Sequence, residues 1–479
     1  MPPTAIHELD ALALAEAIRK KQVSSVEVMT ATLDRIERLN PKVNAIVSLQ
    51  DRGKLLAEAA EKDAMLAKGQ VMGPMHGLPQ AVKDLDNVRG MPTTKGSPLL
   101  KDFMPAADSI QVERMRKAGA IFIGKTNVPQ FGLGSHTTNP VFGPSRNPYD
   151  PTRTPGGSSG GAAVALAMRL LSVADGSDYG GSLRNPAGWN NVFGFRPSTG
   201  RVPSDESDLY LPTMGTAGPM ARNVPDLAML LSVQSGYDPR VPLSIEEDPA
   251  AFAGSLQRDF KGTRIAWLGD LAGYLPFEAG VLDVCRKALK TFEEIGCVVE
   301  EAIPDMAFEE AWRAWLKLRA WQSGGGAKVF YDDPAKRALL NQQAIFEVES
   351  GLRLSAFDIT AAGQVRSAWY KSLLRFFGKY DFFLLPTAQI FPFPVETVWP
   401  TEIAGKPMTT YHEWMKVVLP ATMWGGPVLA VPAGFGANGL PMGLQIVGRN
   451  HAELACLQLA HAYDQASRWV ARHPPKLAG

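Results

Sequence analysis

The sequence predicts an α/β fold: a large mixed, mostly parallel twisted sheet, flanked by helices on both faces and carrying a helical insertion. In the first half of the chain, short apolar runs bounded by glycine alternate with helical sequence, which is the pattern of strand–helix–strand units. Strand-like runs return in the C-terminal third, after a helical middle. We therefore expect a single domain over residues 1–479, in which residues 240–380 form a helical or cap region.

The N-terminal segment contains a clear helix start. Ser24 and Glu27 have the spacing of a capping box, and apolar residues then recur at helical intervals as far as residue 39. Asn40-Pro41 follows, and proline lacks the N–H that a helix interior requires. We expect the helix to stop there.

Two short apolar runs follow, at 77–84 and 119–127, and both have the character of buried strands. The segment 108–117 between them reads as a helix capped by Asp108 or Ser109. A strand, a helix and a second strand in this order predict a right-handed crossover between parallel strands in a largely buried sheet.

Two glycine–serine clusters lie at 156–161 and 180–182. Between them, residues 161–171 are Ala-rich and helical, and residues 172–178 read as the end of a strand. The serines therefore lie in loops at opposite ends of a helix–strand unit, where functional groups of α/β proteins are commonly found.

The middle of the chain differs in character. Residues 308–333 carry three tryptophans on helical sequence, interrupted by three glycines at 324–326 that we expect to be flexible. The tryptophans suit either an aromatic core or a cap that lines an apolar pocket. Strands are then expected at 381–387, 427–435 and 442–448.

The overall charge and the cysteines restrict the function. Of the 479 residues 45% are hydrophobic and 20% charged, and the net charge of +1 gives no support for binding nucleic acid or an anionic membrane. The N-terminus lacks the pattern of a secretory signal, and no apolar run reaches the roughly 18 residues of a spanning helix. Cys285, Cys297 and Cys456 are too scattered for a disulfide framework or a zinc site. We expect a cytoplasmic protein with free thiols.

Several familiar chemistries do not fit the glycine–serine clusters. No lysine follows Gly160-Gly161, so a phosphate-binding loop is missing, and the turn-rich stretch 147–155 is not the strand that a dinucleotide site requires. Residues 180–184 lack the closing glycine of a nucleophile elbow. Only His76 and His136 lie near this part of the chain, and each suits a structural role better than that of a base.

Lys83 is the candidate base. It ends a buried strand, where a lysine is unexpected unless it is solvated at the strand end or paired with Asp84 or Asp86. Burial disfavours the charged amine and lowers its pKa, and a neutral amine can take a proton from a serine hydroxyl.

These features belong to a longer pattern that resembles the amidase signature family. The core motifs fall within residues 60–235, and the resemblance returns from about 380 to 470, while the middle is the part that this family varies. The segments that carry it are GLPQAVKDLDNVRGMPTTKGS (77–97), RTPGGSSGG (153–161), SDYGGSLRNPA (177–187), FGFRPSTGRVP (193–203), GPMARNVPDLAMLL (218–231) and GLPMGLQIVGRN (439–450).

The resemblance implies a Ser-cisSer-Lys triad. Ser182 matches the nucleophile, Ser158 the bridging serine that follows a cis peptide bond, and Lys83 the general base. The two serines lie 24 positions apart, as is usual in the family, whereas the competing Ser159 fits that spacing less well.

The resemblance also implies an oxyanion hole and an acyl pocket. The pocket is expected in the segment 129–139, and aromatic walls are possible from the tryptophans of the insertion and from 422–426. The oxyanion donors are the backbone N–H groups of Tyr179, Gly180, Gly181 and Ser182, and the pocket candidates are Phe131, Leu133 and Ser135.

One motif bears on the substrate. After the nucleophile this chain reads Leu-Arg-Asn-Pro-Ala (183–187), where the glutamine-hydrolysing subunit of an aminoacyl-tRNA amidotransferase typically has Ile-Arg-Gln-Pro-Ala. The departure favours a free-standing amidase on apolar or aryl amides, similar to aryl acylamidases, lactam-oligomer hydrolases or urethanases that cleave carbamates. Such an enzyme would need no cofactor or metal, act on small molecules, and be a monomer or homodimer. The amidotransferase subunit is the alternative.

Overall fold

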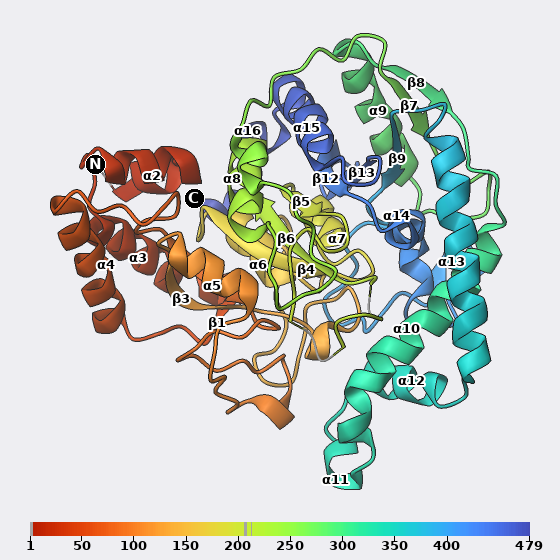
Figure 1. Ribbon diagram of the computed structural model, residues 1–479, viewed down its shortest axis with the longest axis horizontal. Coiled ribbons are helices and arrows are strands. Elements are labelled where there is room, and N and C mark those ends of the chain that lie inside the picture. The colour runs from red at the N-terminus through yellow and green to blue at the C-terminus, as the bar shows by residue number, and fades with distance from the viewer. Residues whose placement is uncertain (1–2, 206–207, 212) are drawn as a thin grey trace.

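The computed structural model describes residues 3–205, 208–211 and 213–479, with side chains from residue 6 onward. Its centre is an eight-stranded sheet with the strand order β4-β6-β5-β12-β13-β9-β7-β8 (Figure 1). In that order the strands are β4 (Val173–Asp178), β6 (Thr216–Ala221), β5 (Phe193–Arg196), β12 (Val428–Phe435), β13 (Pro441–Val447), β9 (Phe382–Pro386), β7 (Arg264–Trp267) and β8 (Val298–Glu301).

The sheet is mixed, as predicted, but it is not mostly parallel. From β4 to β9 every neighbouring pair is antiparallel, and only β9-β7 and β7-β8 are parallel. The connection between β12 and β13 explains part of this, because a few residues suffice for an antiparallel hairpin but not for a parallel crossover. Strands from both halves of the chain do join in one sheet, since β12 pairs with β5.

Helices cover both faces of the sheet, as the sequence predicts. Successive strand residues point to opposite faces, and accordingly Leu429 belongs to one hydrophobic core and Ala430 to another. The first core includes α8 (Val224–Gln234), α9 (Val281–Glu294) and α15 (Glu453–Ser467), and the cores on the other face include α6 (Gly160–Ala167), α13 (Ala356–Phe376) and α14 (Leu419–Trp424).

A second, three-stranded sheet holds the two early strands. β2 (Pro79–Lys83) and β3 (Ile121–Thr126) pair in parallel with α5 (Ile110–Lys117) between them, which confirms the strand–helix–strand unit. β1 (Ile46–Val47) pairs antiparallel with β3 at the edge. This unit lies outside the large sheet, contrary to the expectation of one continuous sheet, although β2 packs against β4. That packing brings Lys83 to the region of the two serine clusters.

The N-terminal helices lie at one end of the molecule and the insertion at the other (Figure 1). The capping box at Ser24 is present, but α3 (Ser25–Val43) continues past Pro41, which lies in its last turn. Asn44, in the left-handed conformation, ends the helix instead. The other helices at this end are α1 (Pro3–Glu8), α2 (Ala11–Arg19) and α4 (Arg52–Ala67), whereas the C-terminal α16 (Trp469–Arg472) packs against β12.

The insertion is not entirely helical, because β7 and β8 lie within residues 240–380 and extend the large sheet. The glycines 324–326 are also not a flexible break, since α10 (Phe308–Tyr331) runs through them. The helices packed beside it are α11 (Pro334–Arg337), α12 (Gln342–Gly351) and α13, and a small hairpin of β10 (Glu402–Ile403) and β11 (Lys406–Pro407) follows later.

Close packing explains the first of these glycines. A Cβ added at Gly324 would lie 2.5 Å from the carbonyl oxygen of Glu347 on α12, so the two helices approach closely there. No atom lies within 4 Å of the corresponding position at Gly325.

The three cysteines are free and buried, and none of the helices in the described part of the chain could cross a membrane.

The adjacent glycines Gly324 and Gly325 make a matched test of the helix contact. Gly325→Ala should raise the free energy of unfolding by up to about 1 kcal/mol, because alanine is the better helix former at an exposed position. Gly324→Ala should lower it by about 1–3 kcal/mol, because the methyl group forces α10 and α12 apart. Denaturant unfolding of both variants measures the difference, and equal effects would contradict the close contact.

Candidate active site

Lys83 ends β2 and is completely buried. Its Nζ lies 2.9 Å from Ser158 Oγ and 2.8 Å from Ser159 Oγ, and 3.0 Å from both the carbonyl oxygen and Oγ of Ser177. Its backbone N–H donates to Asp175 on β4 at 3.0 Å. The alternatives of a solvated strand end or a salt bridge to Asp84 are therefore wrong: Asp84 instead pairs with Lys125 at 3.7 Å.

The environment of Lys83 favours its neutral form. Burial lowers the pKa of this amine to about 8, and Asp86, Asp178 and Asp175 oppose the shift only in part. A lysine in this state can accept a proton near neutral pH, which a solvated lysine cannot.

The first glycine–serine cluster places Ser158 and Ser159 differently. The peptide bond between Gly157 and Ser158 is cis, and α6 begins two residues later at Gly160. Ser158 lines a cavity of about 160 Å³, whereas Ser159 is completely buried and does not line it. Of the two competing serines, Ser158 is therefore the one that a small molecule in this cavity can reach.

Ser182 follows β4 in the turn that leads into α7 (Arg184–Trp189), and it lines the same cavity as Ser158. The preceding Gly181 has φ of +99°, a conformation that side chains disfavour. Ser177, which the sequence reasoning missed, lines the cavity as well. The helix–strand unit thus brings Ser158 and Ser182 to one cavity. Lys83 lies behind that cavity, in contact with Ser158.

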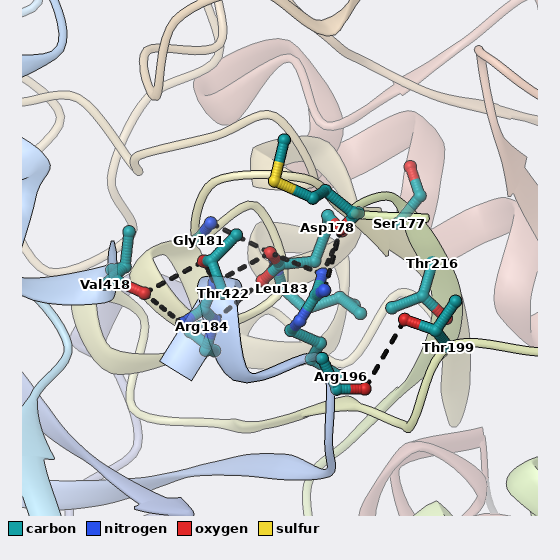
Figure 2. Close-up of polar contacts among 12 residues, drawn as sticks. Ser177, Asp178, Gly181, Leu183, Arg184, Arg196, Thr199, Thr216, Val418 and Thr422 are labelled. Atoms are coloured by element: carbon teal, nitrogen blue, oxygen red, sulfur yellow. Dashed lines mark hydrogen bonds and ion pairs between the residues drawn. The ribbon is translucent and has the colours of Figure 1, made fainter. Parts of the chain in front are cut away.

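A buried carboxylate holds the turn around Ser182 (Figure 2). Asp178 accepts hydrogen bonds from the backbone N–H groups of Gly181 and Leu183, at 2.9 and 3.0 Å, and two from the Arg184 guanidinium, both at 2.9 Å. Arg196 pairs with it at 3.4 Å. Burial alone would raise the pKa of Asp178, but Arg184 and Arg196 lower it well below its usual range. The turn is therefore fixed by a carboxylate that stays charged.

This carboxylate changes the prediction for the oxyanion hole. Because the Gly181 N–H donates to Asp178, it is not free for a ligand. Within the described residues, the N–H groups of Tyr179, Gly180 and Ser182 have no hydrogen-bond acceptor, and all three residues line the cavity. The four predicted donors are thus reduced to three.

The predicted pocket residues Phe131, Leu133 and Ser135 all line the cavity. Leu133 and Ser135 also line an adjacent cavity of about 480 Å³. The remaining lining residues, which the sequence reasoning missed, include Leu85, Arg319, Ser323 and Met415.

No tryptophan is among the described residues that line this cavity, so the aromatic walls expected from the insertion are absent there. The ring of Trp315 lies against Gly180. Trp321 and Trp424, by contrast, line a separate cavity of about 590 Å³ that does not include the serines.

Neither histidine near the motifs approaches the serines. His136 contacts Thr154 Oγ1 at 2.8 Å and the carbonyl oxygen of Val395 at 2.9 Å, and burial lowers its pKa to about 4. His76 contacts the carbonyl oxygen of Lys62. Both have the structural role that the sequence suggested, and Lys83 is the titratable side chain in contact with Ser158. In the described part of the chain, no cluster of side chains could hold a metal ion.

Comparison with known proteins identifies the family of this chain. The family model described as Amidase matches residues 27–457. The chain is a member of the amidase signature family. It is therefore an amide-hydrolysing enzyme. It is 33% identical to an acylamidase of Rhodococcus erythropolis, over 98% of both chains, and 32% identical to a glutamyl-tRNA(Gln) amidotransferase subunit of Moorella thermoacetica, over 98% of this chain and 99% of that one. Its fold matches a bacterial aryl acylamidase with a TM-score of 0.92 and 29% identity, over 99% of both chains.

The Asp178 carboxylate gives the first test of the site. Asp178→Asn would leave two buried arginines without their counter-charge and release the turn around Ser182. We expect it to lower the free energy of unfolding by about 3 kcal/mol and to reduce amide hydrolysis by this enzyme. Asp34→Asn is the matched control, because Asp34 pairs with Arg52 at the surface, where an ion pair contributes about 1 kcal/mol or less. Equal unfolding midpoints for the two variants would contradict this role.

Proposed function

We propose that this amidase cleaves the C–N bond of apolar or aryl amides, and of carbamates, through Ser182, Ser158 and Lys83. The observation that carries the proposal is the contact of 2.9 Å between Lys83 Nζ and Ser158 Oγ, beside a cavity that Ser158 shares with Ser182. An alcohol next to a neutral buried amine can pass on a proton, as a histidine does in other serine hydrolases.

The proposed reaction has two stages. Ser182 Oγ attacks the carbonyl carbon, and its proton passes through Ser158 to the neutral amine of Lys83. The C–N bond then breaks, the leaving nitrogen receives the proton back through Ser158, and an acyl ester remains on Ser182. Water attacks this ester with the same proton relay, which releases the acid and restores Ser182.

The three free backbone N–H groups, of Tyr179, Gly180 and Ser182, surround the place where the carbonyl oxygen becomes negative. Their support for that charge is expected to be large, because removing one such donor typically costs about 10²–10³ in rate. The Gly181 N–H acts indirectly, since its bond to Asp178 fixes the turn.

The cavity walls support an apolar or aryl substrate. Leu85, Phe131, Leu133 and Met415 contribute apolar surface, and such walls favour a ligand with little exposed charge. The acylamidase relatives have names that agree with this class. The proposal includes a single domain in which residues 240–380 cap the cavity, and a free-standing monomer or homodimer that acts in the cytoplasm without a cofactor.

One observation favours a second candidate. The glutamyl-tRNA(Gln) amidotransferase subunit is nearly as similar to this chain as the acylamidase is. A protein of that kind would release ammonia from glutamine and purify with partner chains. The motif at 183–187 argues against it.

Chromogenic substrates test the proposed nucleophile. The purified chain should release p-nitroaniline from an acyl anilide and an arylamine from an aryl carbamate, and Ser182→Ala should abolish both reactions, since it removes the hydroxyl that forms the acyl ester in the proposed reaction. Ser255→Ala, at an exposed serine, should keep the full rate. If neither substrate reacts but glutamine yields ammonia, the amidotransferase subunit is the correct alternative.

The lysine base predicts the pH dependence. The neutral amine is the active form and its pKa is lowered to about 8, so kcat/KM should rise with pH through about 8 and then level off. A substrate without a titratable group in this range, assayed from about pH 6 to about pH 10, gives the profile. In Lys83→Ala the rate should fall steeply and lose this rise. A wild-type optimum near about pH 5 would contradict a lysine base.

A further inference from the structure

The guanidinium of Arg319 borders the reaction cavity. Arg319 lies on α10, in the insertion, and lines the same cavity as Ser158 and Ser182 although only 5% of its surface is exposed. A buried arginine at this cavity requires an explanation, because a charge is costly to bury without partners.

Two of the three guanidinium nitrogens are anchored behind the cavity. Nε donates to Glu347 Oε1 at 2.7 Å, and Nη2 donates to the hydroxyl of Tyr411 at 3.1 Å. His412 Nε2 lies 2.8 Å from the same Glu347 oxygen. The guanidinium also lies over the rings of Tyr179, at 5.1 Å, and Trp315, at 5.3 Å. Its plane is therefore held in one orientation.

The third nitrogen, Nη1, has no hydrogen-bond partner among the described residues, although it carries two N–H groups. It points towards the proposed oxyanion hole: a Cβ added at Gly180 would lie 3.9 Å from it. A Cβ added at Gly132, which also lines the cavity, would lie 3.5 Å from Ser158 Oγ. Ser158 Oγ and Arg319 Nη1 thus lie beside different glycines of the cavity lining.

The charges around Arg319 indicate what Nη1 would bind. Burial lowers the pKa of His412, so this histidine is neutral. Burial alone would raise the pKa of Glu347, but Arg319, together with the contacts to His412 and Tyr411, lowers it to about 2. Arg319 and Glu347 are then the charged members of the cluster and balance each other. A neutral oxygen acceptor suits the remaining N–H groups better than a carboxylate, whose own charge would be left without a counter-charge.

We propose that Arg319 determines substrate specificity by donating a hydrogen bond from Nη1 to a neutral oxygen close to the scissile carbonyl on its acyl side. The enzyme would then prefer carbamates and alkoxyacyl amides to plain alkyl amides. This inference rests on the proposed function, because the leaving nitrogen takes its proton from Ser158. The other substituent of the carbonyl carbon therefore points away from Ser158, towards the wall of Gly180 and Arg319.

Three p-nitroanilides of equal chain length isolate this contact: butanoyl, methoxyacetyl and ethoxycarbonyl. The first has no additional acceptor, the second has an ether oxygen, and the third is a carbamate, and all release the same amine. Dividing each variant rate by the wild-type rate removes the differences in intrinsic reactivity. In Arg319→Met, kcat/KM for the two oxygen-bearing substrates should fall about tenfold more than for the butanoyl anilide, the effect of one charge-assisted hydrogen bond.

Two further variants control for structure. Arg319→Met combined with Glu347→Gln removes the carboxylate that the single change leaves unpaired, and it should show the same selective loss. Arg313→Met changes an exposed arginine of the same helix and should leave the three rates in their wild-type ratio.

The outcomes separate this inference from the proposed function. If wild type cleaves the anilides and Arg319→Met slows all three by one factor, with the double variant behaving alike, Arg319 has only a structural role and the inference is wrong. If wild type cleaves none of the three, or if Ser182→Ala still cleaves them, the proposed function itself is wrong.

Discussion

The burial of one amine, Lys83 Nζ, is the constraint on which the site depends. An amine without water needs hydrogen-bond partners from the protein, and here serine hydroxyls supply most of them. No single element could provide this arrangement. The lysine comes from a small parallel sheet, Ser158 and Ser159 from the loop before α6, and Ser177 from a strand of the large sheet. The packing of β2 against β4 therefore positions the proposed base as well as contributing to the core.

The carboxylates near Lys83 would defeat this arrangement if they all acted on it fully, because negative charge favours the protonated amine. The charge of Asp178 is balanced by its ion pairs with Arg184 and Arg196, which also fix the turn. Its effect on the pKa of Lys83 is correspondingly reduced. Burial and the neighbouring Asp86 raise the pKa of Asp175 to about 6, which makes its charge less stable. Desolvation of Lys83 remains the largest effect. Burial thus lowers the pKa of Lys83 to about 8 although three carboxylates nearby oppose the shift.

Local patterns in the sequence predicted much of this site, and contacts between distant segments account for what was missed. The strands that end at Lys83 and Asp178 were predicted because apolar runs and flanking glycines mark them within a few residues. The direction of strand pairing in the large sheet depends on partners far along the chain, so the sheet was wrongly expected to be mostly parallel. The bond from the Gly181 amide to Asp178 depends on one side-chain rotamer, which no spacing reveals. The glycines of α10 look like a flexible break until α12 lies against the first of them.

The residues proposed for the reaction and for substrate selection come from different parts of the chain. Lys83, Ser158 and Ser182 all lie within the motif-bearing residues 60–235, whose spacing the local fold fixes. Arg319 and Glu347 belong to the insertion, on two helices held together by a glycine contact and a buried ion pair. A change in the insertion would therefore alter which acyl group fits without moving the proposed proton relay. The balance of charge limits such changes. Replacing Arg319 alone would leave the buried carboxylate of Glu347 without its counter-charge, so the arginine and the glutamate have to change together.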